Sequence, residues 1–102
     1  MNALIRPHLD AIARLCRHHD VRRLALFGSA AREDFDPLRS DVDFLVDFEP
    51  MAPGCYADAY FGPLLDLERL LGRPVELVVA AAIKNPYFRE SVERTQALLY
   101  AA

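Results

Sequence analysis

Three acidic side chains and one Gly-Ser pair are the residues of this sequence whose types and spacing could do chemistry. Asp41 and Asp43 stand at i and i+2 at the head of an apolar run, and Glu76 lies inside a later one. In a strand, two such residues share a face about 6.6 Å apart at the backbone. Their carboxylates could converge on one metal ion, or on two ions roughly 3.5–4 Å apart.

Each of these features also has a structural explanation. Alternating apolar and acidic residues are typical of an antiparallel strand with one wet face, so Asp-x-Asp alone is more often structural. Glu76 within an apolar strand costs free energy unless it is exposed, paired or metal-bound. Gly28-Ser29 ends a first apolar run, and Ser29 is expected to cap a short helix from Ala30, whose free N–H groups would favour phosphate. An ordinary strand-to-helix turn is the alternative.

The elements that must position these residues alternate between helix and strand. Strands are predicted over 21–27, 41–48 and 75–79; helices are predicted over 7–19, from 57 or 63 to about 71, and from 86 to about 100. With the short helix expected after Ser29 counted as an element, the order is α-β-α-β-α-β-α. This pattern predicts an α/β (α+β) fold with a small mixed sheet of about three strands flanked by helices.

Side-chain periodicity assigns faces to these elements. In the second strand, Val42, Phe44 and Val46 are expected on one face and Asp41, Asp43 and Leu45 on the other. In the last helix one apolar stripe is expected. Its members are Phe88, Val92, Thr95 and Leu99. Asn85 and Pro86 are expected to cap this helix, and Gly72 to end the one before it.

Length and composition restrict the class of protein. The 102 residues predict a single domain over 1–102, and the net charge of −3 gives no global positive field for nucleic acid. No signal peptide or membrane span is expected. Cys16 and Cys55 fit no zinc spacing, which favours a reduced, cytoplasmic protein. The histidines lack acidic or thiol partners at ligand spacing and are expected to be structural; they are His8, His18 and His19.

Taken together, the motifs resemble the polymerase-beta-type nucleotidyltransferase superfamily. Gly28-Ser29 is followed after eleven residues by Asp41-x-Asp43, and then by Glu76 on a later strand. Three longer segments resemble the minimal nucleotidyltransferase (MNT) proteins, which are antitoxins of HEPN/MNT toxin–antitoxin pairs. They are Phe27-Gly-Ser-Ala-Ala-Arg32, Ser40-Asp-Val-Asp-Phe-Leu-Val46 and Leu71-Gly-Arg-Pro-Val-Glu-Leu-Val78. The sequence departs from the family pattern in having Glu33 for Gly, a spacer one residue longer, and Glu76 for Asp.

The resemblance implies a polymerase-beta-like palm that uses ATP as substrate and Mg²⁺, with two ions, as cofactor. By analogy, Asp41, Asp43 and Glu76 are the catalytic residues and metal ligands. The residues implied in nucleotide binding are Gly28, Ser29, Arg32 and Ser40, with Arg39 as a further phosphate-neutralising candidate. Mg²⁺ prefers oxygen ligands and keeps several waters, so two or three carboxylates suffice.

The function implied is transfer of AMP from ATP to a hydroxyl, expected to be a tyrosine, of a HEPN RNase toxin. A chain of this length has little room for a template, RNA or drug site, and no aromatic-basic platform indicates direct nucleic-acid binding. Two alternatives stay open: an antitoxin that neutralises by binding alone, and nucleotidyl transfer to a small molecule or RNA. A binding surface could use Met51, Tyr56, Tyr60 and Phe61. A homo- or hetero-oligomer is also left open.

Overall fold

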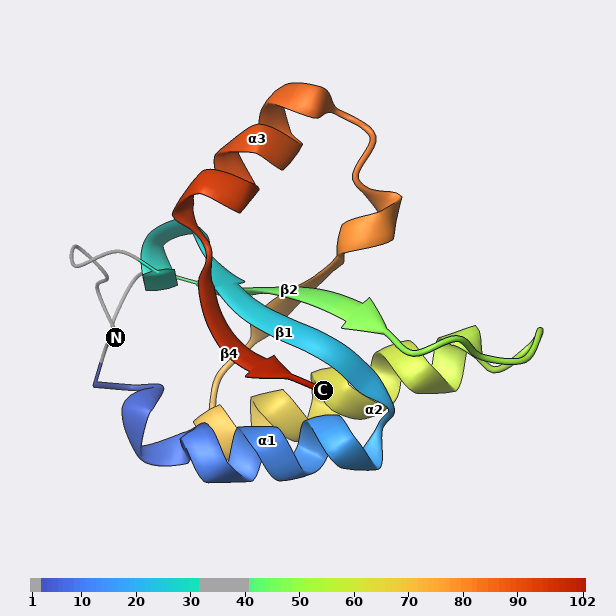
Figure 1. Cartoon of the computed structure of the whole chain (residues 1–102). Helices are drawn as coiled ribbons and strands as arrows, with labels where there is room; N and C mark the ends of the chain where they lie inside the picture. Colours follow the sequence, from blue (N-terminus) through green and yellow to red (C-terminus); the bar gives the residue numbers. More distant parts are fainter. Residues whose placement is uncertain (1–2, 32–40) are drawn as a thin grey trace.

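The chain folds into a four-stranded mixed sheet with helices on both faces (Figure 1). The computed structural model describes residues 3–31 and 41–102. The strands are β1 (Val21–Phe27), β2 (Val42–Phe48), β3 (Val75–Val79) and β4 (Ala97–Ala101). The α-helices are α1 (Leu9–His18), α2 (Tyr56–Leu71) and α3 (Pro86–Thr95), and the 3-10 turns are η1 (Arg6–His8), η2 (Gly28–Ala31) and η3 (Ala80–Ala82).

The strands lie in the order β3-β2-β1-β4. β1 pairs antiparallel with both β2 and β4, whereas β2 and β3 are parallel and are joined by the crossover helix α2. In Figure 1, α1 and α2 lie below the sheet, and α3 lies above it. Along the part of the chain that the structure describes, no helix combines the length and the apolar character needed to cross a membrane.

The two faces of the sheet are covered unequally. Against α1 and α2 the sheet contributes the larger core, built on fully buried Phe44, Leu24 and Leu26. Against α3 a smaller cluster forms between Ala25, Phe27 and Leu45 of the sheet and Ile83 and Val92 beyond it. The predicted alternation in β2 is therefore confirmed. The face that carries Asp43 and Leu45 is the thinly covered one.

The predicted α/β class and the first three strands are confirmed, but the strand count is four because the last segment divides. The helix expected to reach about Tyr100 ends at Thr95, and Ala97–Ala101 forms β4. Gln96 is extended, and its side-chain oxygen accepts a hydrogen bond of 2.8 Å from Arg23 of β1. The prediction that the helical apolar stripe continues to Leu99 was therefore wrong. The free edge of β1 offers this segment backbone hydrogen-bond partners, and helical spacing does not reveal them.

Local signals account for the other boundaries. Asn85 caps α3, accepting from the backbone N–H groups of Tyr87 and Phe88. Gly72 ends α2 with a φ of 67°, where a side chain would be strained. Pro63 lies buried inside α2, which begins earlier, at Tyr56. Ser29 is the second residue of η2, whereas the sequence placed it before a helix.

Candidate active site

The candidate residues lie side by side where β1 ends and where β2 and β3 begin. Phe27 of β1 is opposite Asp43 of β2, and Asp43 is opposite Glu76 of β3. Residues directly opposite across neighbouring strands lie about 5 Å apart and point to the same face. Asp43 and Glu76 therefore share the α3 face of the sheet. Asp43 is partly buried and Glu76 is exposed, so solvent reaches this pair.

Gly28 follows Phe27 and lies against the Asp43 carboxylate. A Cβ built on Gly28 would stand 2.8 Å from Asp43 Oδ2, which is closer than real Cβ contacts come. Its φ of +66° is also in the left-handed region that favours glycine. The sequence predicted a glycine that permits close approach. In the structure, the group that approaches is the carboxylate oxygen of the protein itself.

The Asp43 carboxyl group holds a proton more tightly than an ordinary aspartate. Burial, a side-chain hydrogen bond with Glu76, and the charges of Glu76 and Asp41 raise the pKa of Asp43 to about 6. Two carboxyl groups can hydrogen-bond only when a proton lies between them, since ionised oxygens only accept. Crowded acids of this kind are typical of functional sites. Asp41, exposed and directly before β2, lies close enough to contribute repulsion.

The donor set suits a hard divalent cation. Asp43 Oδ1 is buried and has no hydrogen-bond partner among the residues that the structure describes. A buried carboxylate oxygen without a protein partner is a position where a bound water or ion would satisfy it. Within residues 3–31 and 41–102, no three His, Cys, Asp or Glu side chains are arranged to hold a metal by themselves. The protein would thus supply part of a coordination sphere, which fits Mg²⁺, an ion that keeps several waters and completes its shell with substrate phosphates.

The remaining predicted residues differ in what the structure says of them. Ser29 is partly buried in η2, one residue beyond the glycine that faces Asp43. Arg32, Arg39 and Ser40 lie outside the described residues, so their proposed roles with phosphate stay predictions. Asp41 is not brought into a complete three-carboxylate cluster with the other two acids.

Two aromatic residues lie at this site that the sequence did not predict there. Phe27 is 8% exposed and is the cross-strand neighbour of Asp43. Its ring makes an edge-to-face contact with Phe88 of α3, with centroids 5.9 Å apart. The signal for Phe27 was its position directly before Gly28. For Phe88 no signal existed, because only the fold of α3 over the sheet brings residue 88 to residue 27.

Comparison with known proteins identifies the family of this chain. Residues 10–97 match the family model described as "Nucleotidyltransferase domain". A protein of Methanocaldococcus jannaschii, named "Putative protein adenylyltransferase MJ0128", is 38% identical over 79 residues, which are 74% of this chain and 72% of that protein. A solved structure described as a "putative minimal nucleotidyltransferase" superposes with a TM-score of 0.75 at 34% identity, covering 91% of this chain and 90% of that one.

A more distant structure shares the fold. It is a tri-AMPylated Shewanella oneidensis HEPN toxin in complex with MNT antitoxin, 18% identical with a TM-score of 0.64, and the match covers 95% of this chain and 72% of that one. The family match, over residues 10–97, extends over most of the chain. This chain belongs to the nucleotidyltransferase domain family and is a nucleotidyltransferase similar to protein adenylyltransferases.

Proposed function

We propose that this protein transfers AMP from ATP to a hydroxyl group of a partner protein, and that the partner is a HEPN toxin whose tyrosine accepts the AMP. The observation that carries the proposal is the pairing of Asp43 with Glu76 across β2 and β3 beside Gly28, on a face of the sheet that solvent reaches. The named relatives support the adenylyl group, and the distant structural neighbour supports a HEPN toxin as the partner.

The site residues have separable tasks in this reaction. Gly28 leaves the Asp43 carboxylate uncovered, so that a triphosphate can approach along the backbone of η2. Asp43 and Glu76, with Asp41 beside them, would hold magnesium. When bound, magnesium supplies neutralisation of the charge that develops on the transferred phosphoryl group. Above pH 6, Asp43 is ionised, which is the form that binds a cation. Glu76, exposed beside it on β3, either completes this metal site or is positioned to accept the proton of the attacking hydroxyl.

The exposed acids favour an acceptor that docks from outside. Glu76 is exposed at the edge strand β3, and Asp41 is exposed just before β2. A hydroxyl on a folded partner can reach acids at such an edge without entering the protein. This supports a protein acceptor over a small molecule, which usually needs an enclosing site.

Transfer can be tested with purified protein, labelled ATP, Mg²⁺ and the candidate HEPN partner. We expect label on the partner with the natural protein and none with Asp41→Asn and Asp43→Asn combined. Asp47→Asn is the matched control, because Asp47 also lies on β2, four residues from Asp43, opposite Arg23. Unlabelled partner with the natural protein, or equal labelling by the double variant, contradicts the proposal.

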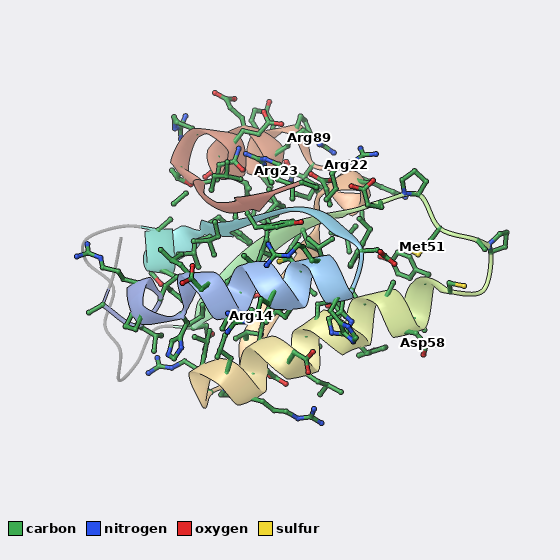
Figure 2. All side chains as sticks on the ribbon, turned by 60° about the horizontal axis from the view of Figure 1, so that its bottom comes forward. Arg14, Arg22, Arg23, Met51, Asp58 and Arg89 are labelled. Carbon is green, nitrogen blue, oxygen red and sulfur yellow. The ribbon has the colours of Figure 1, made fainter. Side chains whose placement is uncertain are left out.

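A second candidate is neutralisation of the toxin by binding alone. Near the start of α2, Met51, Tyr56 and Phe61 are 37%, 51% and 54% exposed, and Figure 2 shows Met51 at this end of the molecule, away from α3. Tyr60 instead packs against the core. If the double Asp→Asn variant still protects cells from the toxin while Phe61→Asp does not, binding is the mechanism.

A further inference from the structure

We propose that Phe88 is the surface on which the base of the nucleotide stacks, an inference that rests on the proposed use of ATP. Among the described residues, Phe88 is the aromatic side chain whose ring contacts Phe27, the neighbour of Asp43 across β1 and β2. A nucleotide whose phosphates lie at Gly28 and Asp43 would extend along this face of the sheet toward α3.

Exposure distinguishes the two rings of the pair. Phe27 is 8% exposed and Phe88 is 42% exposed, although their centroids are only 5.9 Å apart and their planes meet at 76°. In an edge-to-face pair the rings do not cover one another's faces as stacked rings do. The ring that remains available to a ligand is therefore that of Phe88, with Phe27 supporting it from the sheet.

The backbone of Phe88 is held in place before any ligand binds. Its N–H donates to Asn85 Oδ1 at 3.2 Å, and the N–H of Tyr87 donates to the same oxygen at 2.9 Å. Arg89 donates from its guanidinium group to the carbonyls of Ala80 and Ile83, which ties the first turn of α3 to the segment after β3. Figure 2 shows Arg89 on the α3 side of the sheet. A half-exposed ring on a backbone that is already fixed loses less freedom on binding a base than one on a mobile segment.

The alternative is that Phe88 only covers Phe27. This packing role can be separated from stacking by replacing the ring with a side chain of similar apolar bulk. Phe88→Leu keeps apolar contact with Phe27 but removes the aromatic face, whereas Phe88→Tyr keeps the face. Tyr87→Ala is the matched control, because Tyr87 is the adjacent residue, is 81% exposed, and makes no ring contact within the described part of the chain.

The experiment measures binding of ATP and of inorganic tripolyphosphate, each with Mg²⁺ and without partner, to the folded full chain by calorimetry. We expect Phe88→Ala and Phe88→Leu to weaken ATP binding by roughly 5- to 150-fold, the effect of removing one ring from beneath a base. Tripolyphosphate binding should not change, and Phe88→Tyr and Tyr87→Ala should bind ATP as the natural protein does. In transfer assays the loss should raise KM for ATP more than it lowers kcat.

The failures of the two proposals are distinguishable. If the natural protein binds ATP and Phe88→Ala binds it equally well, the stacking inference alone is overturned. It is also overturned if Phe88→Leu retains full ATP affinity, or if ATP and tripolyphosphate binding fall together, since both results indicate packing. If the natural protein binds neither ligand and transfers no AMP, the proposed function itself fails, and the stacking inference fails with it.

Discussion

At the scale of single residues, Asp43 connects the parts of the site. It lies between Phe27 and Glu76 in the sheet, touches Gly28, and keeps one buried oxygen without a partner among the described residues. Removing the partner of a buried polar group carries a free-energy penalty, and so does crowding it with like charge. Such strain is typical of a site arranged for a ligand, and it leads to two predictions.

Asp43→Asn should stabilise the metal-free protein at neutral pH. The raised pKa of Asp43, about 6 against 3.8, means that the stabilisation from its bound proton is complete below pH 3.8 and is lost as the pH rises through 6. Asparagine cannot ionise and avoids this loss. Urea unfolding in the presence of a chelator should give Asp43→Asn a free energy of unfolding about 1 kcal/mol above that of the natural protein at pH 7.5, a value already reduced for the partial exposure of the group. At pH 3.5 the two proteins should not differ. An equal difference at both pH values would contradict this.

Gly28→Ala should abolish most of the transfer activity while leaving the fold intact. The new Cβ would meet Asp43 Oδ2 at 2.8 Å, at a φ of +66°. Gly72→Ala is a closely matched control, because Gly72 has a φ of +67° and open space where a Cβ would go. Both variants should lose about 1–2 kcal/mol of unfolding free energy from the left-handed backbone. Only Gly28→Ala should lose transfer of AMP, by tenfold or more; equal activities would show that the approach to Asp43 is unimportant.

At the scale of elements, the edge strand β3 is held by side chains of the crossover helix α2. The Tyr60 hydroxyl donates to the carbonyl of Leu77 at 2.8 Å, and the N–H of Val75 donates to Glu68 Oε2 at 3.2 Å. These bonds flank Glu76, whose backbone pairs with β2. Polar groups on an edge strand otherwise need water or another chain. α2 therefore does more than cover the core, because it fixes the strand that carries the second carboxylate.

Tyr60→Phe tests this link. The change keeps the ring and removes the hydroxyl, so the Leu77 carbonyl loses its donor. The expected loss is about 1 kcal/mol of unfolding free energy. Hydrogen exchange should also become faster in β3 than in β1. Tyr56→Phe is the control, since Tyr56 is 51% exposed, and it should change neither quantity. Unaltered exchange in β3 after Tyr60→Phe would contradict a role for α2 in fixing the edge.

At the scale of the whole molecule, the sheet divides the protein into a supporting face and a working face. The supporting face packs on α1 and α2 through fully buried residues of β1 and β2, while the working face carries the carboxylates under the thin cover of α3 (Figure 1). Binding sites need open polar surface, and stability needs closed apolar surface. A small domain meets both needs by assigning them to opposite faces of one sheet.

Phe44→Ala should show where stability resides. Phe44 is fully buried in β2, one of the two inner strands, on the supporting face. Losing a buried Phe side chain typically costs about 3–5 kcal/mol, a large share of the stability of a domain this size. Phe61→Ala, which removes the same side chain from a position 54% exposed, should cost well under 1 kcal/mol. Chemical denaturation of both variants checks this, and similar losses would place the core elsewhere.

Local patterns were sufficient for much of this architecture. The period-2 alternation of β2 placed its apolar residues on one face and Asp43 on the other because strand geometry leaves no alternative. Asn85 and Gly72 marked helix ends because capping depends on the residue itself. The segment after Thr95 was misassigned because a strand at an edge is specified by the neighbour it pairs with, here β1, and not by its own spacing.

The sequence by itself determined the chemistry available to this protein: three acids, a Gly-Ser turn, and the strands that carry them. Residue types and their local periodicity are properties of the chain, so the candidate residues and the strands that carry them could be predicted without coordinates. Only the tertiary structure decided which groups meet. The parallel pairing of β2 with β3 set Asp43 beside Glu76, the return of β4 completed the sheet, and the fold of α3 brought Phe88 to Phe27. These contacts join residues far apart in sequence. They depend on which strands pair and on how α3 packs over the sheet, and local spacing specifies neither.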